Sequence, residues 1–169
     1  MPVMADAAYA ANAARAGKVD AVAGYLPSGN AYHVWSPADW AGFAHVKRQP
    51  IWVAGSAAAE HEAWTAIGWL KELGAPPGPV VIDLETRVDP LYVHVFTEVL
   101  DCRGYWGVPY GSTSTIYRNP RRGGYWVAKP GPCPASLPAG VNGIQYGENL
   151  RGGAYDLSLI SAGWLRHMW

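Results

Sequence analysis

Short apolar runs alternate with helical patterns along most of the chain. A helical pattern over residues 7–16 ends at Gly17, and a β-rich run over residues 21–26 follows it. The longest helix is expected over residues 58–73, where apolar side chains recur at helical spacing. Further helices are predicted from Ser36-Pro37, from Asp89-Pro90 to Cys102, and over residues 113–117. Further strands are predicted over residues 2–4, 50–55, 79–85, 105–110, 125–128, 142–146 and 156–160.

This alternation predicts an α/β fold with a largely parallel sheet. We predict a compact, irregular TIM-like (β/α) barrel rather than an open doubly wound sheet, because no strand is followed by a G-x-G-x-x-G turn. Such barrels usually need about 200 residues or more, so the last crossovers of this 169-residue chain are expected to be short. Neither an internal repeat nor a linker divides the chain, which predicts one barrel domain over residues 1–169.

Composition narrows the classes of function. Apolar side chains make up 50% of the chain, and 13 Lys and Arg balance 13 Asp and Glu. A neutral chain of this kind is neither disordered nor charged for nucleic acid. Its apolar runs fall short of the roughly 18 residues that a membrane span needs, and residues 1–17 lack the apolar core of a secretory signal. We therefore expect neither nucleic acid nor a membrane as a partner, and synthesis in the cytoplasm.

The sequence carries no motif for a metal or a cofactor, and we expect neither. Cys102 and Cys133 form no C-x-x-C pattern and are predicted to be free thiols. His61-Glu62 begins like the zinc motif H-E-x-x-H, but position 65 is Thr. What the chain has in excess is aromatic rings with a polar edge, nine Trp and ten Tyr, and such rings suit the faces of sugars as well as a core.

The candidate chemistry lies at Asp83 and Glu85. Residues at i and i+2 of a strand face the same way, and this strand is apolar on both faces, which indicates that it is buried. Carboxylates at the carboxyl end of such a strand are costly unless they are paired or used, and that end is where active sites of parallel α/β folds assemble. Two close acids do not both ionise freely, so the pKa of one should rise, as a general acid requires.

Five runs, in order VVIDLET, VPYGSTSTIY, GYWVAK, GIQYG and YDLSLI, resemble the motif set of glycoside hydrolase family 25-like barrels, which are lysozyme-type muramidases and their bacterial and phage relatives. The resemblance extends roughly from Ala21 onward. It aligns the family's D-x-E pair with Asp83 and Glu85, and its C-terminal acid with Asp156. The family's tyrosine after its fifth strand corresponds to Tyr110, and the tryptophan of its next motif corresponds to Trp126. The strand of the family that carries a Gln-Tyr pair corresponds to Gln145-Tyr146.

The resemblance implies that Glu85 donates a proton to the glycosidic oxygen. It implies that Asp83 and Asp156 stabilise positive charge at the sugar or orient its N-acetyl group. The family also carries an acid on its first strand, for which Asp6 is the nearest candidate and Asp20 the other.

From their places near strand ends, Tyr110 and Trp126 are expected to stack on sugars, with Tyr25 as a third ring. Arg118, Arg121 and Arg122 form a basic loop that suits either solvent or an anionic cell-wall polymer.

Two functions remain open at this point. One is a glycosidase that cleaves peptidoglycan-type glycan at the cell wall. The other is a glycan-binding or structural barrel without turnover, for example a phage virion component or a homo-oligomer. The observation that separates them is whether a third carboxylate reaches Asp83 and Glu85 from the first or last strand.

Overall fold

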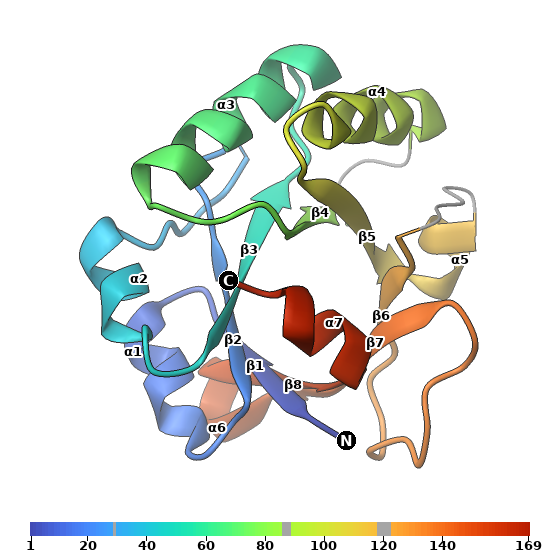
Figure 1. The fold of residues 1–169 in the computed structure, drawn as a ribbon. Coiled ribbons are helices and arrows are strands. Elements are labelled where there is room, and N and C mark those ends of the chain that lie inside the picture. Colours follow the sequence, from blue (N-terminus) through green and yellow to red (C-terminus); the bar gives the residue numbers. More distant parts are fainter. Residues whose placement is uncertain (29, 86–88, 118–122) are drawn as a thin grey trace.

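Eight strands close into a barrel in the order β1 to β8 (Figure 1). The computed structural model describes residues 1–28, 30–85, 89–117 and 123–169. The strands are β1 (Val3–Asp6), β2 (Ala21–Tyr25), β3 (Lys47–Val53), β4 (Pro79–Asp83), β5 (Trp106–Ser112), β6 (Tyr125–Ala128), β7 (Val141–Asn149) and β8 (Tyr155–Ile160). The helices are α1 (Ala10–Ala13), the 3-10 turn η1 (Ala14–Ala16), α2 (Pro37–Gly42), α3 (Ala59–Glu72), α4 (Pro90–Asp101), α5 (Thr113–Tyr117), α6 (Leu150–Gly153) and α7 (Ala162–His167).

The barrel sheet is mixed. Strands β1 to β7 run parallel to their neighbours, whereas β8 runs antiparallel to both β7 and β1. The prediction of a TIM-like (β/α) barrel with a largely parallel sheet is therefore wrong, and the fold is a closed, eight-stranded mixed β-barrel. The reason is local, because only residues 150–154 separate β7 from β8. A parallel crossover needs a dozen residues or more, whereas so short a connection returns the chain as a hairpin.

Most of the predicted elements form near their expected positions. Ser36 accepts a hydrogen bond from Asp39 N and Asp39 bonds back to Ser36 N, so a capping box begins α2. Helix α4 begins at Pro90, and the Asp89 side chain accepts from Leu91 N. The terminal helix α7 was not predicted, because its six residues lie in a tail rich in Gly and Pro.

Alternation along the strands separates a core inside the barrel from apolar clusters on its outer face. Side chains such as Met4, Val81 and Val108 fill the barrel interior. Their sequence neighbours, such as Ile82, point outward and pack with Leu70 of α3 and Phe96 of α4. Because successive side chains of a strand face opposite ways, a polar residue two positions beyond an interior one also faces inward.

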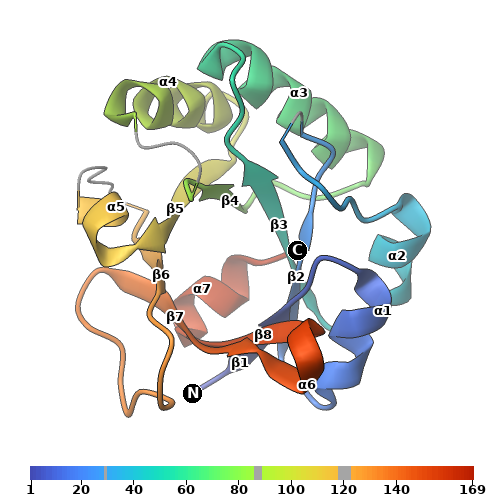
Figure 2. The ribbon, with the colours of Figure 1, turned by 180° about the vertical axis from the view of Figure 1, so that it is seen from behind.

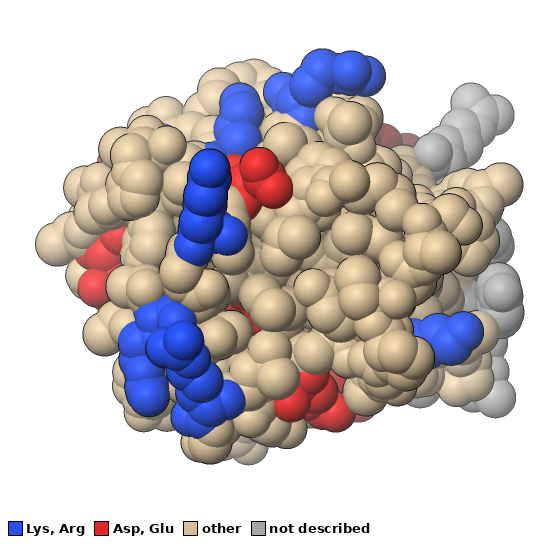
Figure 3. All heavy atoms as spheres, turned by 90° about the horizontal axis from the view of Figure 1, so that it is seen from below, with Lys and Arg blue, Asp and Glu red and all other residues tan. Residues whose placement is uncertain are grey.

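The two ends of the barrel differ. Helix α7 lies across one end (Figure 1), where Trp164 and Met168 join the interior core. Figure 2 views the opposite end, toward which the strands β1 to β7 run. Among the described residues, none of the helices has the length and apolar character to cross a membrane. On the face seen in Figure 3, basic and acidic side chains are dispersed over a mostly uncharged surface. Cys102 and Cys133 are exposed free thiols, as predicted.

Candidate functional site

A polar layer lies above the apolar interior, at the barrel end opposite α7. Asp6 lies two residues beyond Met4, Asp83 two beyond Val81, and Tyr110 two beyond Val108, and all three are buried. Each strand thus places an apolar side chain inside the barrel and a polar one at its carboxyl end. Asp83 and Tyr110 are register partners of β4 and β5.

The antiparallel direction of β8 adds a further carboxylate to this end. Asp156 is the second residue of β8, and it pairs in register with Asp6 of β1. Had β8 run parallel to β1, its beginning would lie at the end that α7 covers. Side chains directly opposite in an antiparallel pair are neighbours on one face, so Asp6 and Asp156 lie side by side.

A backbone hydrogen bond holds the Asp83–Glu85 segment. Glu85 N donates to Asp83 Oδ1 at 3.0 Å, and Leu84 N donates to the Tyr110 carbonyl oxygen at 3.1 Å. The side chain of Asp83 is buried, whereas Glu85, just beyond the strand, is exposed. The two carboxyl groups therefore differ in their access to a ligand.

Tyr110, Gln145 and Asp156 form a chain of hydrogen bonds across three strands. The Tyr110 hydroxyl donates to Gln145 Oε1. Gln145 Nε2 donates to Asp156 Oδ2 at 2.8 Å, and Asn149 N donates to Asp156 Oδ1 at 2.6 Å. Both oxygens of Asp156 are thereby oriented by protein groups. Of the sequence-predicted residues, Gln145 thus contacts the candidate acid Asp156 directly, and Tyr110 is linked to it through Gln145.

The pKa values of the candidate acids are raised. Burial raises the pKa of Asp83 to about 6, against the opposing effect of the bond from Glu85 N. Burial, followed by the charges of Asp156, Asp83 and Glu85, raises the pKa of Asp6 well above its usual value. Burial and then the charges of Glu148 and Asp156 raise the pKa of Glu85. Burial also raises the pKa of Asp156.

A cavity of about 200 Å³ opens beside these acids. Asp83 and Glu85 line it together with Tyr25 at the end of β2 and with Tyr32 and His33 of the following loop. The Tyr32 side chain is 94% exposed, which is unusual for so large a ring. The neighbouring His33 ring packs on Tyr9, with their centroids 4.2 Å apart. Sequence reasoning missed Tyr32 and His33, because nothing in the sequence distinguishes them from other loop residues.

Two further residues differ from the sequence-based expectation. Trp126 was expected to stack on a sugar, and Glu148 was not among the predicted site residues. Trp126 is 1% exposed, its Nε1 donates to Ser158 Oγ at 3.0 Å, and its ring packs with Tyr110, so its faces are not open to a sugar. Glu148, exposed near the end of β7, acts electrostatically on Glu85 and Asp156.

Asp20 lies elsewhere, before β2, and accepts from Val3 N at 2.8 Å. Arg118, Arg121 and Arg122 lie outside the described residues.

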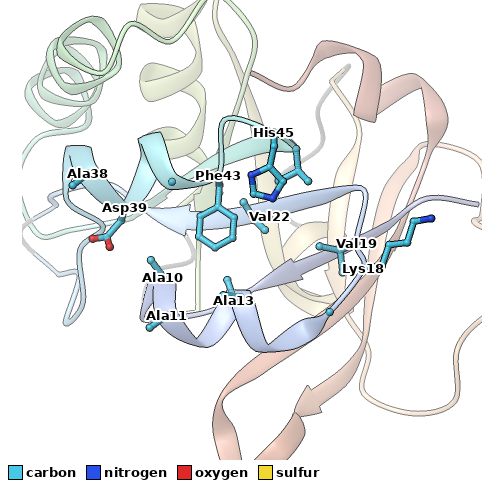
Figure 4. A pocket seen from close by; sticks show the side chains of 14 residues that line it. Ala10, Ala11, Ala13, Lys18, Val19, Val22, Ala38, Asp39, Phe43 and His45 are labelled. Atoms are coloured by element: carbon cyan, nitrogen blue, oxygen red, sulfur yellow. The ribbon is translucent and has the colours of Figure 1, made fainter.

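A larger hollow, of about 680 Å³, lies outside the barrel between α1 and α2 (Figure 4). Small and apolar residues such as Ala10, Ala13 and Phe43 line it, and the carboxylate of Asp39 at its edge is engaged by Ser36. Because it holds no group of acids or bases that face one another, the end with the four carboxylates remains the candidate site.

Two solved structures share this architecture. A structure of an uncharacterized protein of B. stearothermophilus matches with a TM-score of 0.81 at 19% identity, covering 100% of both chains. A glycosyl hydrolase 25 of Streptococcus pneumoniae, GHIP, matches with a TM-score of 0.65 at 12% identity, covering 95% of this chain and 87% of that one. The chain shares the barrel fold of these two structures. At these identities the likeness concerns the fold alone. No model of a known protein family matches the sequence, and no curated protein matches it either.

Proposed function

We propose that this protein is a glycoside hydrolase that cleaves a peptidoglycan-type glycan by carboxylate acid/base chemistry. The observation that carries the proposal is the convergence of Asp6, Asp83, Glu85 and Asp156 from β1, β4 and β8 at one barrel end. Acids from the first and last strands accompany the Asp83–Glu85 pair, as a catalytic site requires and a simple strand-end pair does not. The fold shared with a glycosyl hydrolase 25 supports the same reaction class.

Glu85 is the proposed proton donor. Glu85 lines the cavity and is exposed there, while partial burial of its carboxyl group and then the charges of Glu148 and Asp156 raise its pKa. A carboxyl group with a raised pKa keeps its proton closer to neutral pH and transfers it to the departing glycosidic oxygen.

Asp83 and Asp156 are the proposed electrostatic partners of that step. Positive charge that develops on the sugar ring is stabilised by carboxylates held in place before the reaction. Asp83 is held through Glu85 N, and Asp156 through Gln145 and Asn149. Asp6 is the most deeply buried acid of the site, and the negative charges of the other acids help to raise its pKa. Tyr110 and Gln145 act as positioning residues for Asp156.

Tyr25, Tyr32 and His33 are the proposed sugar contacts. They line the cavity that Asp83 and Glu85 also line, and the exposed ring of Tyr32 offers an apolar face with a polar edge. Such a ring packs against the C–H face of a pyranose while its hydroxyl reaches sugar oxygens.

The decisive experiment is Glu85→Gln assayed for release of reducing ends from purified bacterial cell walls. The amide retains the shape of the side chain but has no proton to give, so the rate should fall by about 100-fold or more. Glu72→Gln is the matched control, because Glu72 is exposed at the end of α3. Thermal unfolding of both variants checks that the fold is retained. Equal rates for Glu85→Gln and the wild type would refute the proposal.

A glycan-binding barrel without turnover is the second candidate. Both oxygens of Asp156 already accept protein hydrogen bonds, which favours a fixed recognition site. Under this alternative the wild type binds cell walls in a sedimentation assay and releases no reducing ends.

A further inference from the structure

The candidate site gathers more carboxyl groups than one acid pair requires. We call Asp6, Asp83, Glu85, Glu148 and Asp156 the carboxylate cluster. Its members interact electrostatically. The charges of Asp156, Asp83 and Glu85 add to the effect of burial in raising the pKa of Asp6, and the charge of Glu148 contributes to the raised pKa values of Glu85 and Asp156. Within the part of the chain that the structure describes, neither Lys nor Arg forms an ion pair with any of the five.

Among the described residues, one carboxyl oxygen of the cluster has no hydrogen-bond donor. Asp6 is 5% exposed, and its Oδ2 receives no hydrogen bond from the described residues. A buried carboxyl oxygen without a donor is unfavourable, so a donor that a ligand brings would relieve the desolvation of Asp6. Asp6 faces the other acids of the cluster, since its Cα partner across β8 is Asp156.

The positions of the carboxylates indicate whether a compact metal ion or an extended, positively charged ligand matches the site better. Among the described residues, no three His, Cys, Asp or Glu side chains are grouped closely enough to hold a metal ion. The acids instead extend from the buried Asp6 at the carboxyl end of β1 to the exposed Glu85 and Glu148. Positive groups spaced along an extended ligand match this arrangement better than one compact ion does.

We propose that the site selects a glycan that carries free amino groups, such as glucosamine units, over its N-acetylated counterpart. This inference rests on the proposed glycan-directed function and names its substrate class. Each ammonium supplies a positive charge and three donors, and bonds from such a group to carboxylates are stronger than those between neutral partners. An acetamide in the same place is neutral and offers a single N–H, so the cluster keeps its uncompensated charge.

Binding to two oligosaccharides of equal length tests the preference, one built of glucosamine and one of N-acetylglucosamine. Calorimetric titration of the Glu85→Gln protein at about pH 6.5, where a sugar amine is protonated like an α-amino group, measures binding without turnover. The glucosamine oligosaccharide should bind roughly 10- to 100-fold more tightly, the range that charge-assisted hydrogen bonds supply, and raised salt should narrow the gap.

Glu148→Gln in the same Glu85→Gln background isolates the role of the cluster. Removal of one rim charge should reduce the preference for glucosamine by about 2- to 5-fold. Glu72→Gln in that background should leave the preference unchanged, since Glu72 lies on α3 outside the cluster.

The failure of this inference is distinct from that of the proposed function. Equal or tighter binding of the N-acetylated oligosaccharide, or no binding of either, overturns the ammonium preference. If cell walls are still cleaved by the wild type, the glycosidase proposal stands in each of these cases. A preference that survives Glu148→Gln unchanged also counts against the cluster as its source.

Discussion

At the scale of single residues, Asp83 combines burial with negative charge. It is 6% exposed, and burial raises its pKa from 3.8 to about 6. A carboxyl group whose pKa is raised on folding favours the folded state only while it is protonated. Stability from this group is thus complete below about pH 4 and is lost as the pH rises through about 6.

Asp83→Asn is therefore expected to stabilise the protein near pH 7.5. The amide is never charged, and it still accepts from Glu85 N, so the variant avoids a penalty on the order of 2–3 kcal/mol. Urea unfolding from about pH 4 to pH 8 measures the free energy of unfolding at each pH. The decline of wild-type stability between about pH 4 and pH 6 should be shallower in the variant. A variant less stable than the wild type at neutral pH would contradict this account.

Among the secondary-structure elements, α3 is joined to β3 and α4 by the hydrogen bonds of Glu62. This buried carboxylate in the first turn of α3 accepts from Trp52 Nε1 of β3 at 2.9 Å and from the Tyr92 hydroxyl of α4 at 2.5 Å. It also accepts from Gly55 N and Ala57 N at 2.9 and 3.0 Å. A Cβ at Gly55 would lie 2.3 Å from Glu62 Oε1, so the loop requires glycine there. Glu62, the second residue of the incomplete zinc motif that begins at His61, thus connects α3 with β3 and α4.

Glu62→Ala is expected to destabilise the fold by about 3 kcal/mol or more. The substitution leaves four donors without their acceptor, and bonds to a charged group that form a network are worth more than isolated ones. Chemical denaturation measures the loss. Glu60→Ala, an exposed glutamate in the same helical turn, is the control and should change stability by less than about 1 kcal/mol. Similar losses in both variants would show that the network contributes little.

At the scale of the whole molecule, the chain end closes the barrel. Trp164 of α7 and Met168, which follows the helix, enter the interior core. Trp169 pairs with β3 through backbone bonds to Arg48 of 2.7 and 3.1 Å. The Arg48 guanidinium also lies 3.7 Å from the centre of the Trp169 ring. The terminal helix thus seals one end and leaves the other for the carboxylates.

Trp164→Ala is expected to cost about 3–5 kcal/mol, the usual loss for a large buried aromatic side chain. Trp64→Ala is the matched control, because Trp64 is 41% exposed on α3 and should cost about 1 kcal/mol or less. Thermal unfolding compares the two. Binding of glycan by folded Trp164→Ala protein at low temperature should persist, since Trp164 lies at the end opposite the carboxylates. Equal losses in the two variants would mean that α7 adds little to the core.

Most of the elements and one part of the candidate site are predictable from local sequence patterns. The apolar run that ends at Asp83 and the caps at Ser36 and Asp89 are local signals, and local signals are legible in sequence. These signals place the Asp83–Glu85 pair at a strand end without reference to any tertiary contact.

Tertiary structure alone decided how the rest assembles. The pairing of β8 with β1 joins the two ends of the described chain, and this non-local contact brings Asp156 beside Asp6. Burial of Trp126 depends on its partners Ser158 and Trp164 from the end of the chain, which no local pattern reveals. The approach of Glu148 to the acids has the same origin. Periodicity specifies which residues share a face of an element, whereas closure of the barrel decides which faces meet.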